Sequence, residues 1–296
     1  MSATRGPVLV LGRSGQVARA LTAAAAGRGL PCLSLGRGEL DLAAGAALAA
    51  ALDRVQPSAV INAAAYTAVD RAEDEPDAAF RLNRDVPGEI ARACAERALP
   101  FVHFSTDYVF DGAGDAPYAE DHPRRALNVY GRSKAEGEDA VAAAGGRWIV
   151  LRTSAVYAAQ GTNFVTTMLR LAGACTTVEV VDDQLTRPTW AADCARAALL
   201  ATASLAEGGD SGVLHLAGGG EATWAEFAAA IFAGSAAHGG PAAEVRPVST
   251  AAFGARAVRP ADARLDDAAF RARFAWGPSP WRSSLGLCLD EITAAG

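Results

Sequence analysis

The sequence predicts an α/β protein built on a doubly wound parallel sheet, with a smaller C-terminal lobe interleaved with it. Short apolar and β-branched runs alternate with longer Ala-rich segments through roughly the first two-thirds of the 296 residues. Beyond residue 156 the elements become shorter and are punctuated by Gly and Pro, as at Gly218–Gly220. Strands buried on both faces and joined by crossover helices are typical of parallel sheets.

The individual elements follow from this alternation. Strands are predicted at the short apolar runs, near residues 8–11, 31–35, 59–62, 100–104, 148–151, 177–181 and 213–216. Helices are predicted between them, over 16–27, 43–55, 86–98, 128–144 and 192–205. We expect residues 1–155 to form the sheet domain, with the strands near 177–181 and 213–216 added to its sheet. Residues 156–296 then form mainly the smaller lobe, with a ligand in the crevice between the two.

The composition indicates a folded globular protein, with 51% hydrophobic and 20% charged residues. A net charge of −6 and scattered basic residues argue against nucleic acid as a partner, because nucleic-acid binding needs a basic face. Five widely spaced cysteines and four unpaired histidines predict neither a disulfide framework nor a metal site. Without a bilayer-spanning apolar stretch or a signal-peptide core, we expect a cytoplasmic protein that contacts no membrane.

The first predicted strand runs into a glycine turn, Gly12-Arg13-Ser14-Gly15-Gln16-Val17-Ala18. Glycines in such a turn let the backbone approach a pyrophosphate, which then binds the free N–H groups of the following helix. The same pattern also occurs in ordinary turns between a strand and a helix. Its place in the first strand–helix unit of an alternating chain favours a dinucleotide site in a Rossmann-like sheet.

The end of the second predicted strand bears on the choice of cofactor. Folds that prefer NAD often place an acid there for the ribose 2′-hydroxyl, whereas an arginine accommodates the 2′-phosphate of NADP. The sequence reads Leu35-Gly36-Arg37-Gly38, with no acid before Glu39. Arg37 therefore favours NADPH, with NADH still possible, over the alternative of a solvated surface arginine.

Lys134 is the only lysine among the 27 basic residues, and it follows Tyr130 by four positions in a predicted helix. Residues four apart share one helical face. Reduction of a ketone by hydride needs a proton donor near the carbonyl oxygen, and a nearby ammonium lowers the pKa of a tyrosine. The pair therefore favours a ketone reductase over a surface lysine beside a half-buried tyrosine. A hydroxyl from Ser105-Thr106, at the end of the fourth strand, would complete the site.

Six motifs span most of the chain: GRSGQVA (12–18), NAAAYTAVD (62–70), STDYVFDG (105–112), NVYGRSKAEGE (128–138), RTSAVY (152–157) and VVDDQLTRPT (180–189). In content and order they resemble the dTDP-4-dehydrorhamnose reductases, a family of extended short-chain dehydrogenases/reductases. STDYVFDG with the downstream NVYG…K is specific to this branch, whereas the glycine turn is not.

The resemblance implies an oxidoreductase that reduces the C4 keto group of a dTDP-4-dehydro-6-deoxy sugar with NADPH. Tyr130 would protonate the C4 oxygen, Lys134 would bind the nicotinamide ribose and tune Tyr130, and Thr106 would bind the carbonyl. The sugar is expected against Ser105, Thr106, Asp107, Tyr130 and Ala155. Combined with the interpretations above, the dinucleotide is expected against Gly12, Gly15, Gln16, Val17, Arg37, Asp41, Leu42, Ala63, Ala64, Ala65, Tyr66, Thr67, Tyr130 and Lys134.

The sequence also departs from the family pattern. Ala155 stands where relatives commonly have Trp, and Thr186 stands where they have Gly, which bears on the sugar accepted. Ala20 replaces an acid associated with metal-bridged dimers, so we expect no metal and either a monomer or a homodimer. The alternative functions are a nucleotide-sugar 4-epimerase, another deoxysugar ketoreductase, and a non-catalytic regulatory subunit that binds NADP.

Overall fold

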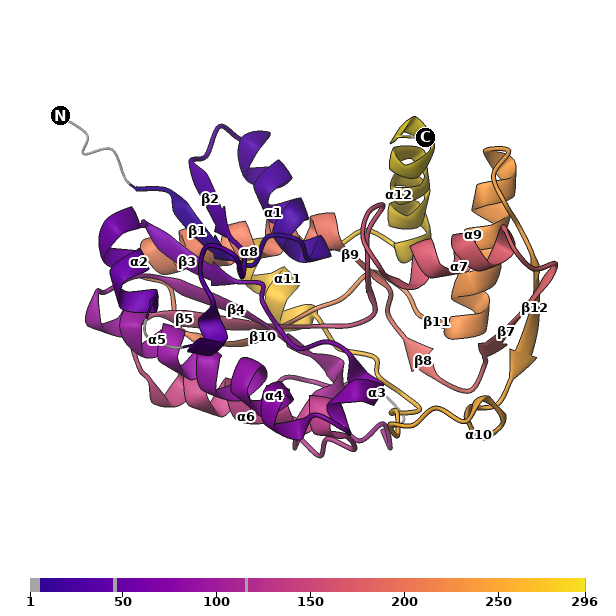
Figure 1. Ribbon diagram of the computed structural model, residues 1–296, viewed down its shortest axis with the longest axis horizontal. Coiled ribbons are helices and arrows are strands. Elements are labelled where there is room, and N and C mark those ends of the chain that lie inside the picture. Colours follow the sequence, from indigo (N-terminus) through magenta and orange to yellow (C-terminus); the bar gives the residue numbers. More distant parts are fainter. Residues whose placement is uncertain (1–5, 45–46, 115–116, 296) are drawn as a thin grey trace.

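The computed structural model describes residues 6–44, 47–114 and 117–295 and contains a parallel six-stranded sheet beside a smaller lobe (Figure 1). The sheet order is β10-β5-β4-β3-β1-β2. The strands are β1 (Val8–Leu11), β2 (Cys32–Leu35), β3 (Ala59–Asn62), β4 (Phe101–Thr106), β5 (Trp148–Thr153) and β10 (Gly212–Leu216). The predicted fold class is confirmed. The chain places β2 on one side of β1 and the later strands on the other side. A point where the strand order reverses in this way opens a crevice at the carboxyl ends of the strands.

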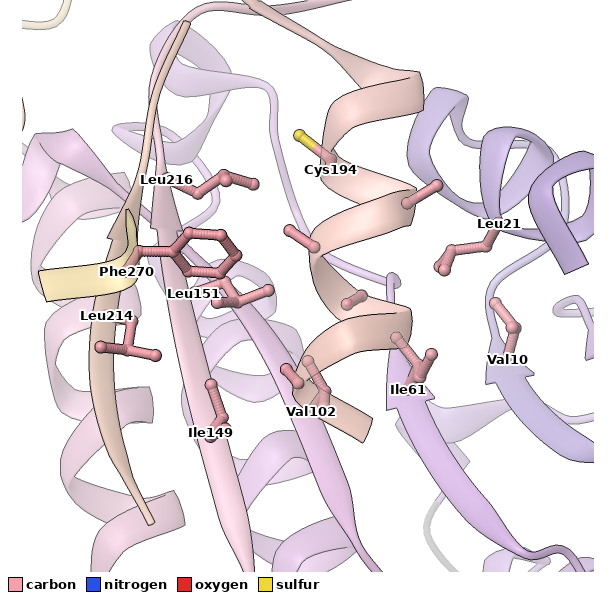
Figure 2. Close-up of a cluster of buried hydrophobic side chains, with 14 of the residues drawn as sticks. Val10, Leu21, Ile61, Val102, Ile149, Leu151, Cys194, Leu214, Leu216 and Phe270 are labelled. Atoms are coloured by element: carbon pink, nitrogen blue, oxygen red, sulfur yellow. The ribbon is translucent and has the colours of Figure 1, made fainter. Parts of the chain in front are cut away.

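Helices cover both faces of the sheet. One face carries α1 (Gln16–Ala26), α8 (Ala191–Ala206) and α11 (Ala268–Phe274), and the other carries α2 (Leu48–Val55), α5 (Val86–Glu96) and α6 (Val129–Ala143). Because successive strand side chains point to opposite faces, each strand serves two cores. Val10 packs beneath α1 and α8, whereas its neighbours Leu9 and Leu11 pack towards α2 and α5. Figure 2 shows the first core, with Val10, Ile61 and Val102 beside the helix that carries Cys194.

The smaller lobe has a core of its own, centred on Tyr157, Phe227 and Trp281. Its helices are α7 (Phe164–Ala172), α9 (Trp224–Ala237), α10 (Thr250–Phe253) and α12 (Trp281–Ala295). Its strands form three pairs: β6 (Val156–Tyr157) with β9 (Thr189–Trp190), β7 (Thr177–Val181) with β12 (Glu244–Val248), and β8 (Leu185–Thr186) with β11 (Ala222–Thr223). Since α8 and β10 return to the large sheet between these pieces, the lobe is interleaved with the sheet.

The prediction that the strand near 177–181 joins the large sheet is wrong. This strand, β7, pairs with β12 in a separate parallel sheet. Its residues alternate between exposed and buried from Thr177 to Val180, so one of its faces meets solvent. The strands of the large sheet are covered by helices on both faces, whereas the alternation in β7 is typical of a strand with one face in solvent. The strand predicted near 213–216 does join the large sheet, as β10.

Several connections differ from the predicted elements. The helix predicted over 43–55 is observed as a 3₁₀ turn, η1 (Leu42–Ala44), and the shorter α2, while residues 45–46 lie outside the described residues. The stretch before α5 holds α3 (Val69–Ala72), α4 (Pro76–Phe80) and a π-helical turn, η2 (Arg81–Asp85), and a 3₁₀ turn, η3 (Asp107–Val109), follows β4. Throughout the described ranges, every helix is too short or too polar to span a membrane.

Candidate active site

Two adjoining cavities open at the carboxyl ends of the central strands. The first, of about 600 Å³, lies over the ends of β1, β2 and β3, and the second, of about 440 Å³, lies between the sheet and the smaller lobe. Gly15, Ala63, Ala65 and Thr67 line both of them. One elongated ligand, or two ligands in contact, can therefore occupy the pair. This is the crevice that the switch point of a doubly wound sheet provides.

The first cavity is shaped to receive a diphosphate. Gly12 has a φ of +113°, which favours glycine, and it turns the chain sharply from β1 towards α1. A Cβ on Gly15 would meet no protein atom within 4 Å, so it would stand in open space beside the cavity. Gly15 is the N-cap of α1 and no side chain caps the helix, which leaves its first N–H groups free for an anion.

Ten of the residues predicted for the dinucleotide line this first cavity. They are Gly12, Gly15, Arg37, Asp41, Leu42, Ala63, Ala64, Ala65, Tyr66 and Thr67. The other four, Gln16, Val17, Tyr130 and Lys134, line the second cavity. Gln16 donates to Val156 O at 2.9 Å, while its buried Oε1 has no hydrogen-bond partner among the described residues. A ligand that donates to this oxygen would satisfy it, which suits the amide or hydroxyl groups of a nicotinamide nucleoside.

The arginines of the first cavity differ in whether the protein already holds them. Three of the four have acidic partners: Arg13 pairs with Glu39, Arg71 with Glu75 and Arg81 with Glu89. Arg37 lines the same wall, is exposed, and has no hydrogen bond or ion pair with any described residue. It is therefore the arginine of this cavity that is free to bind a phosphate.

The loop that lines both cavities is held from behind by Asn83, in the π-helical turn η2. Asn83 Oδ1 accepts from Tyr66 N at 2.8 Å, and Asn83 Nδ2 donates to Tyr66 O at 3.0 Å. The same Nδ2 donates to Ser133 Oγ, one residue before Lys134, at 3.0 Å. Asn83 is therefore a buried clamp between this loop and α6.

The predicted catalytic residues come together on the wall of the second cavity. Thr106 ends β4, and Tyr130 and Lys134 lie in the first two turns of α6, which begins at the cap residue Asn128. Asn128 Oδ1 accepts from Gly131 N at 2.7 Å and so fixes the start of this helix. Thr106 and Tyr130 line the same cavity, and Thr106 acts to lower the pKa of the Tyr130 phenol. A carbonyl oxygen in this cavity can thus approach both hydroxyls.

Burial dominates the acidity of Tyr130. It raises the pKa of the phenol to about 12, while the hydrogen bond from Thr106 acts in the lowering direction. The expected lowering of this pKa by Lys134 is not found: burial, Thr106 and Asp107 account for the shift. The Lys134 ammonium group is turned towards β4, where Nζ donates to Phe104 O at 2.5 Å and lies 3.2 Å from His103 Nε2. A protonated phenol is the form required of a proton donor.

Of the residues predicted for the sugar, Ser105 and Asp107 line the cavity but are themselves largely buried. Ser105 Oγ donates to Glu138 Oε1 at 2.5 Å, so the proton of this hydroxyl is already used within the protein. Asp107 accepts from Thr106 Oγ1 at 2.9 Å and from Ser154 Oγ at 2.8 Å. Asp107 therefore orients the hydroxyl of Thr106.

Burial raises the pKa of Asp107 to about 6, above its ordinary value of 3.8. The folded protein then binds a proton that the unfolded chain has released between pH 4 and pH 6, so stability falls as the pH rises through this window. The Asp107→Asn variant removes this cost, and we expect its free energy of unfolding at pH 7 to rise by about 1–3 kcal/mol. Urea unfolding at pH 4 and pH 7 tests this. No gain at pH 7, with an unchanged pH slope, contradicts it.

Ala155 lies on the cavity wall with a φ of +44°, in the left-handed region. A methyl group here leaves more space beside the sugar site than the Trp commonly found in relatives. Thr186, which replaces a glycine of the family pattern, also lines the cavity and shares a 2.7 Å hydrogen bond with Ser154. Both departures from the family pattern thus lie on the same surface that a substrate would contact.

Sequence reasoning missed several residues of the two cavities. Arg13 lies inside the glycine turn, yet it was given no role, and Tyr108 lines the second cavity with its ring 5.8 Å from that of Tyr130. Arg259, which acts on the pKa of Tyr108, pairs with Asp70 at 2.7 Å. The STDYVFDG motif contains Tyr108 and gave a local signal for it, whereas the Arg259–Asp70 pair joins positions far apart in the chain. Nowhere in the described ranges do three or more His, Cys, Asp or Glu side chains gather as a metal site.

The chain matches the family model described as the RmlD substrate binding domain over residues 6–294. It is 41% identical to a dTDP-4-dehydrorhamnose reductase of Burkholderia thailandensis over 294 residues, which covers 96% of this chain and 98% of that protein. It is 37% identical to a dTDP-4-keto-6-deoxy-D-glucose reductase of Streptomyces niveus, with 85% of each chain covered.

Solved structures agree with these sequence matches. The crystal structure of dTDP-4-dehydrorhamnose reductase from Bacillus anthracis in complex with NADP superposes with a TM-score of 0.90 at 30% identity, covering 97% of this chain and all of that one. The matches cover nearly the whole chain, including both lobes and both cavities. The chain therefore belongs to the dTDP-4-dehydrorhamnose reductase family.

Proposed function

We propose that this protein is an NADPH-dependent oxidoreductase that reduces the C4 keto group of dTDP-4-dehydro-L-rhamnose to give dTDP-L-rhamnose. One observation carries the proposal: Thr106, Tyr130 and Lys134 line a cavity that adjoins the cavity at the glycine turn. A dinucleotide whose diphosphate is bound at the glycine turn would extend into the second cavity and would supply its hydride beside the proton donor. The names of the relatives and the NADP of the Bacillus anthracis structure support the same assignment.

The residues divide the work as follows. NADPH, when bound, supplies the hydride. Tyr130 gives its phenolic proton to the C4 oxygen. Thr106, whose hydroxyl donates to Asp107 in the free protein, would turn this proton to the C4 oxygen and hold that oxygen next to the phenol. Lys134 binds the nicotinamide ribose and stabilises the phenolate that remains on Tyr130. Asp107 and Ser154 keep the Thr106 hydroxyl in place from below.

The division of the chain follows the two cavities. The first is lined only by residues between Gly12 and Leu82, whereas the second adds residues from Thr153 to Ala263. We propose residues 1–155 as the NADP-binding domain, completed by β10, and residues 156–296 as mainly the sugar-binding lobe. We further propose that the protein works in the cytoplasm as a monomer or homodimer, which cell fractionation and analytical ultracentrifugation test.

The decisive experiment offers the protein NADPH and dTDP-4-keto-6-deoxyhexoses, before and after treatment with a 3,5-epimerase, and identifies the product. Formation of dTDP-L-rhamnose only from the epimerised sugar supports the proposal. Reduction of the sugar before epimerisation supports a different dTDP-deoxysugar ketoreductase, an outcome that the space beside Ala155 and the Streptomyces niveus relative favour. Interconversion of sugars without net oxidation of NADPH would identify an epimerase instead. Absence of both the reductase and the epimerase activity would support a regulatory NADP-binding subunit.

Arg37 is expected to recognise the 2′-phosphate of NADPH. The Arg37→Ala variant should raise the KM for NADPH by about tenfold or more, because a charge-assisted hydrogen bond is typically worth 1.5–3 kcal/mol. The KM for NADH, which lacks this phosphate, should change less than about twofold by the same reasoning. Arg13→Ala is the matched control, since Arg13 lines the same wall but is held by Glu39. Equal effects of Arg37→Ala on the two cofactors rule out phosphate recognition by this residue.

A further inference from the structure

A buried hydrogen-bonded chain leads from the cofactor loop to Lys134. Ala64 N donates to Asn62 Oδ1 at 3.1 Å, and Asn62 Nδ2 lies 3.1 Å from His103 Nδ1. His103 Nε2 in turn lies 3.2 Å from Lys134 Nζ. Asn62 and His103 are fully buried, and Lys134 is 2% exposed. The proposed reaction gives Asn62 and His103 no role, although they connect two parts of the site.

The backbone N–H of Ala64 sets the direction of this chain. It can only donate, so the amide oxygen of Asn62 faces it and the amide nitrogen faces His103. That nitrogen can also only donate, so His103 Nδ1 must accept. Burial, which is the larger cause, holds the pKa of His103 well below its ordinary value, so the ring is neutral. A neutral imidazole that accepts at Nδ1 carries its proton on Nε2 and directs it at Lys134.

The Nε2 proton of His103 has no acceptor on Lys134 if Lys134 is an ammonium. An ammonium has three donors and no acceptor, whereas an uncharged amine offers a lone pair to the Nε2 proton. Lys134 Nζ still has a donor for Phe104 O. We propose that Asn62 and His103 are positioning residues that hold Lys134 Nζ in place and favour its uncharged amine. The proposal rests on the role given to Lys134 above. That role needs the ammonium, and the tautomer of the neighbouring imidazole then sets the pH below which the ammonium forms.

A second buried histidine shows the opposite arrangement. His215 Nδ1 faces a backbone carbonyl, Tyr118 O at 3.0 Å, so it must donate there. Its Nε2 is then a free acceptor and lies 3.1 Å from the guanidinium nitrogen Nη1 of Arg152. Beside the buried cation Arg152, the neighbouring histidine His215 is thus in the tautomer that can accept a hydrogen bond from the cation. At His103 the amide nitrogen of Asn62 takes the place of that carbonyl and reverses the tautomer.

The other groups around Lys134 leave this effect in place. Glu138, one turn further along α6, acts to raise the pKa of Lys134, but burial lowers it to about 8. The Glu138 carboxylate is itself bound by Arg152 at 2.7 Å and by Arg124 at 3.2 Å, so two guanidinium groups share its charge. On the cavity side, Tyr130 and the buried Asp107 line the same cavity as Lys134.

The single lysine makes the charge of Lys134 directly measurable. Protein labelled with [ε-¹³C]lysine gives one lysine resonance, whose titration between pH 6 and pH 11 reports the pKa of Lys134 without substrate or turnover. The Asn62→Asp variant reverses the chain, because a carboxylate accepts from both Ala64 N and His103 Nδ1. His103 Nε2 then offers a lone pair to the ammonium. We expect the midpoint to rise by about one pH unit or more relative to wild type.

A double variant separates this relay from a simple charge effect. Asn62→Asp is also introduced into the His103→Phe protein, where a carboxylate is present but no imidazole can transmit it. There we expect less than about half of the shift. Equal shifts in both backgrounds, or a wild-type midpoint near the ordinary value of about 10.4, overturn the proposal. If the Asn62→Asp protein does not fold, His103→Gln places an acceptor beside Lys134, and an unchanged midpoint is then the contrary result. Because no turnover is measured, loss of the proposed reductase activity leaves the titration readable.

Discussion

The Tyr130→Phe variant is expected to lower kcat by about a hundredfold or more, since a positioned general acid is typically worth 10²–10⁴ in rate. Only the phenolic oxygen is lost, so the ring keeps its place beside Tyr108 and the cavity keeps its shape. Binding of the sugar and the cofactor should change little, and the loss should appear in kcat and not in KM. Steady-state kinetics with NADPH and the epimerised dTDP-4-keto-6-deoxyhexose measure both.

Tyr108→Phe is the matched control for this substitution. It removes the same atom from the same cavity wall, at a ring whose centroid lies 5.8 Å from that of Tyr130. Its hydroxyl contacts Arg259 and has no part in the proposed proton transfer. We expect a change of less than about tenfold, as is usual for a hydrogen bond outside the reacting groups. If Tyr130→Phe keeps activity within a few-fold of wild type, or if both variants lose the same activity, Tyr130 is not the proton donor.

The fold could be predicted from the sequence wherever a segment is buried on both faces. The runs at β1, β3 and β4 are short, mostly apolar and buried along nearly their whole length, and short apolar runs bounded by turn residues indicate strands. At β7 the prediction of a strand was correct and its partner was wrong. Pairing with β12 joins residues 177–181 to residues 244–248, and no local pattern in β7 specifies a partner so far along the chain.

The parts of the site that could be predicted are those encoded by short spacings. The glycine turn occupies seven residues, and Tyr130 and Lys134 are four apart on one helix, so each motif is visible without knowledge of the fold. Asn83 could not be placed in the same way. Its clamp on Tyr66 needs the π-helical turn η2, and a π turn has no clear sequence signature.

The contacts between β4 and α6 could be predicted only in part. His103 and Ser105 are two apart on a strand and so share a face about 6.6 Å long. Lys134 and Glu138 are four apart on a helix and are separated by about 6 Å along its axis. The matched spacings let His103 meet Lys134 while Ser105 meets Glu138. Both spacings are visible in the sequence, but they predict these contacts only when α6 is known to lie across β4.

The Lys134→Met variant is expected to lower kcat by about a hundredfold or more and also to raise the KM for NADPH, because two interactions are lost together. The ammonium no longer stabilises the phenolate of Tyr130, and the nicotinamide ribose loses a hydrogen-bond donor. Methionine keeps the length and apolar stem of lysine, so the buried space remains filled. Activity assays at several NADPH concentrations separate the two effects.

Stability should respond to this substitution very differently from activity. Burial lowers the pKa of Lys134 to about 8, which means that folding works against its charge. Methionine removes that cost, and the relief offsets the loss of the hydrogen bond to Phe104 O. We therefore expect a melting temperature close to that of wild type in a nearly inactive protein. A variant that is inactive because it is unfolded would show no such separation, and one that keeps more than about a tenth of the wild-type kcat would show that the reaction does not need the amine of Lys134.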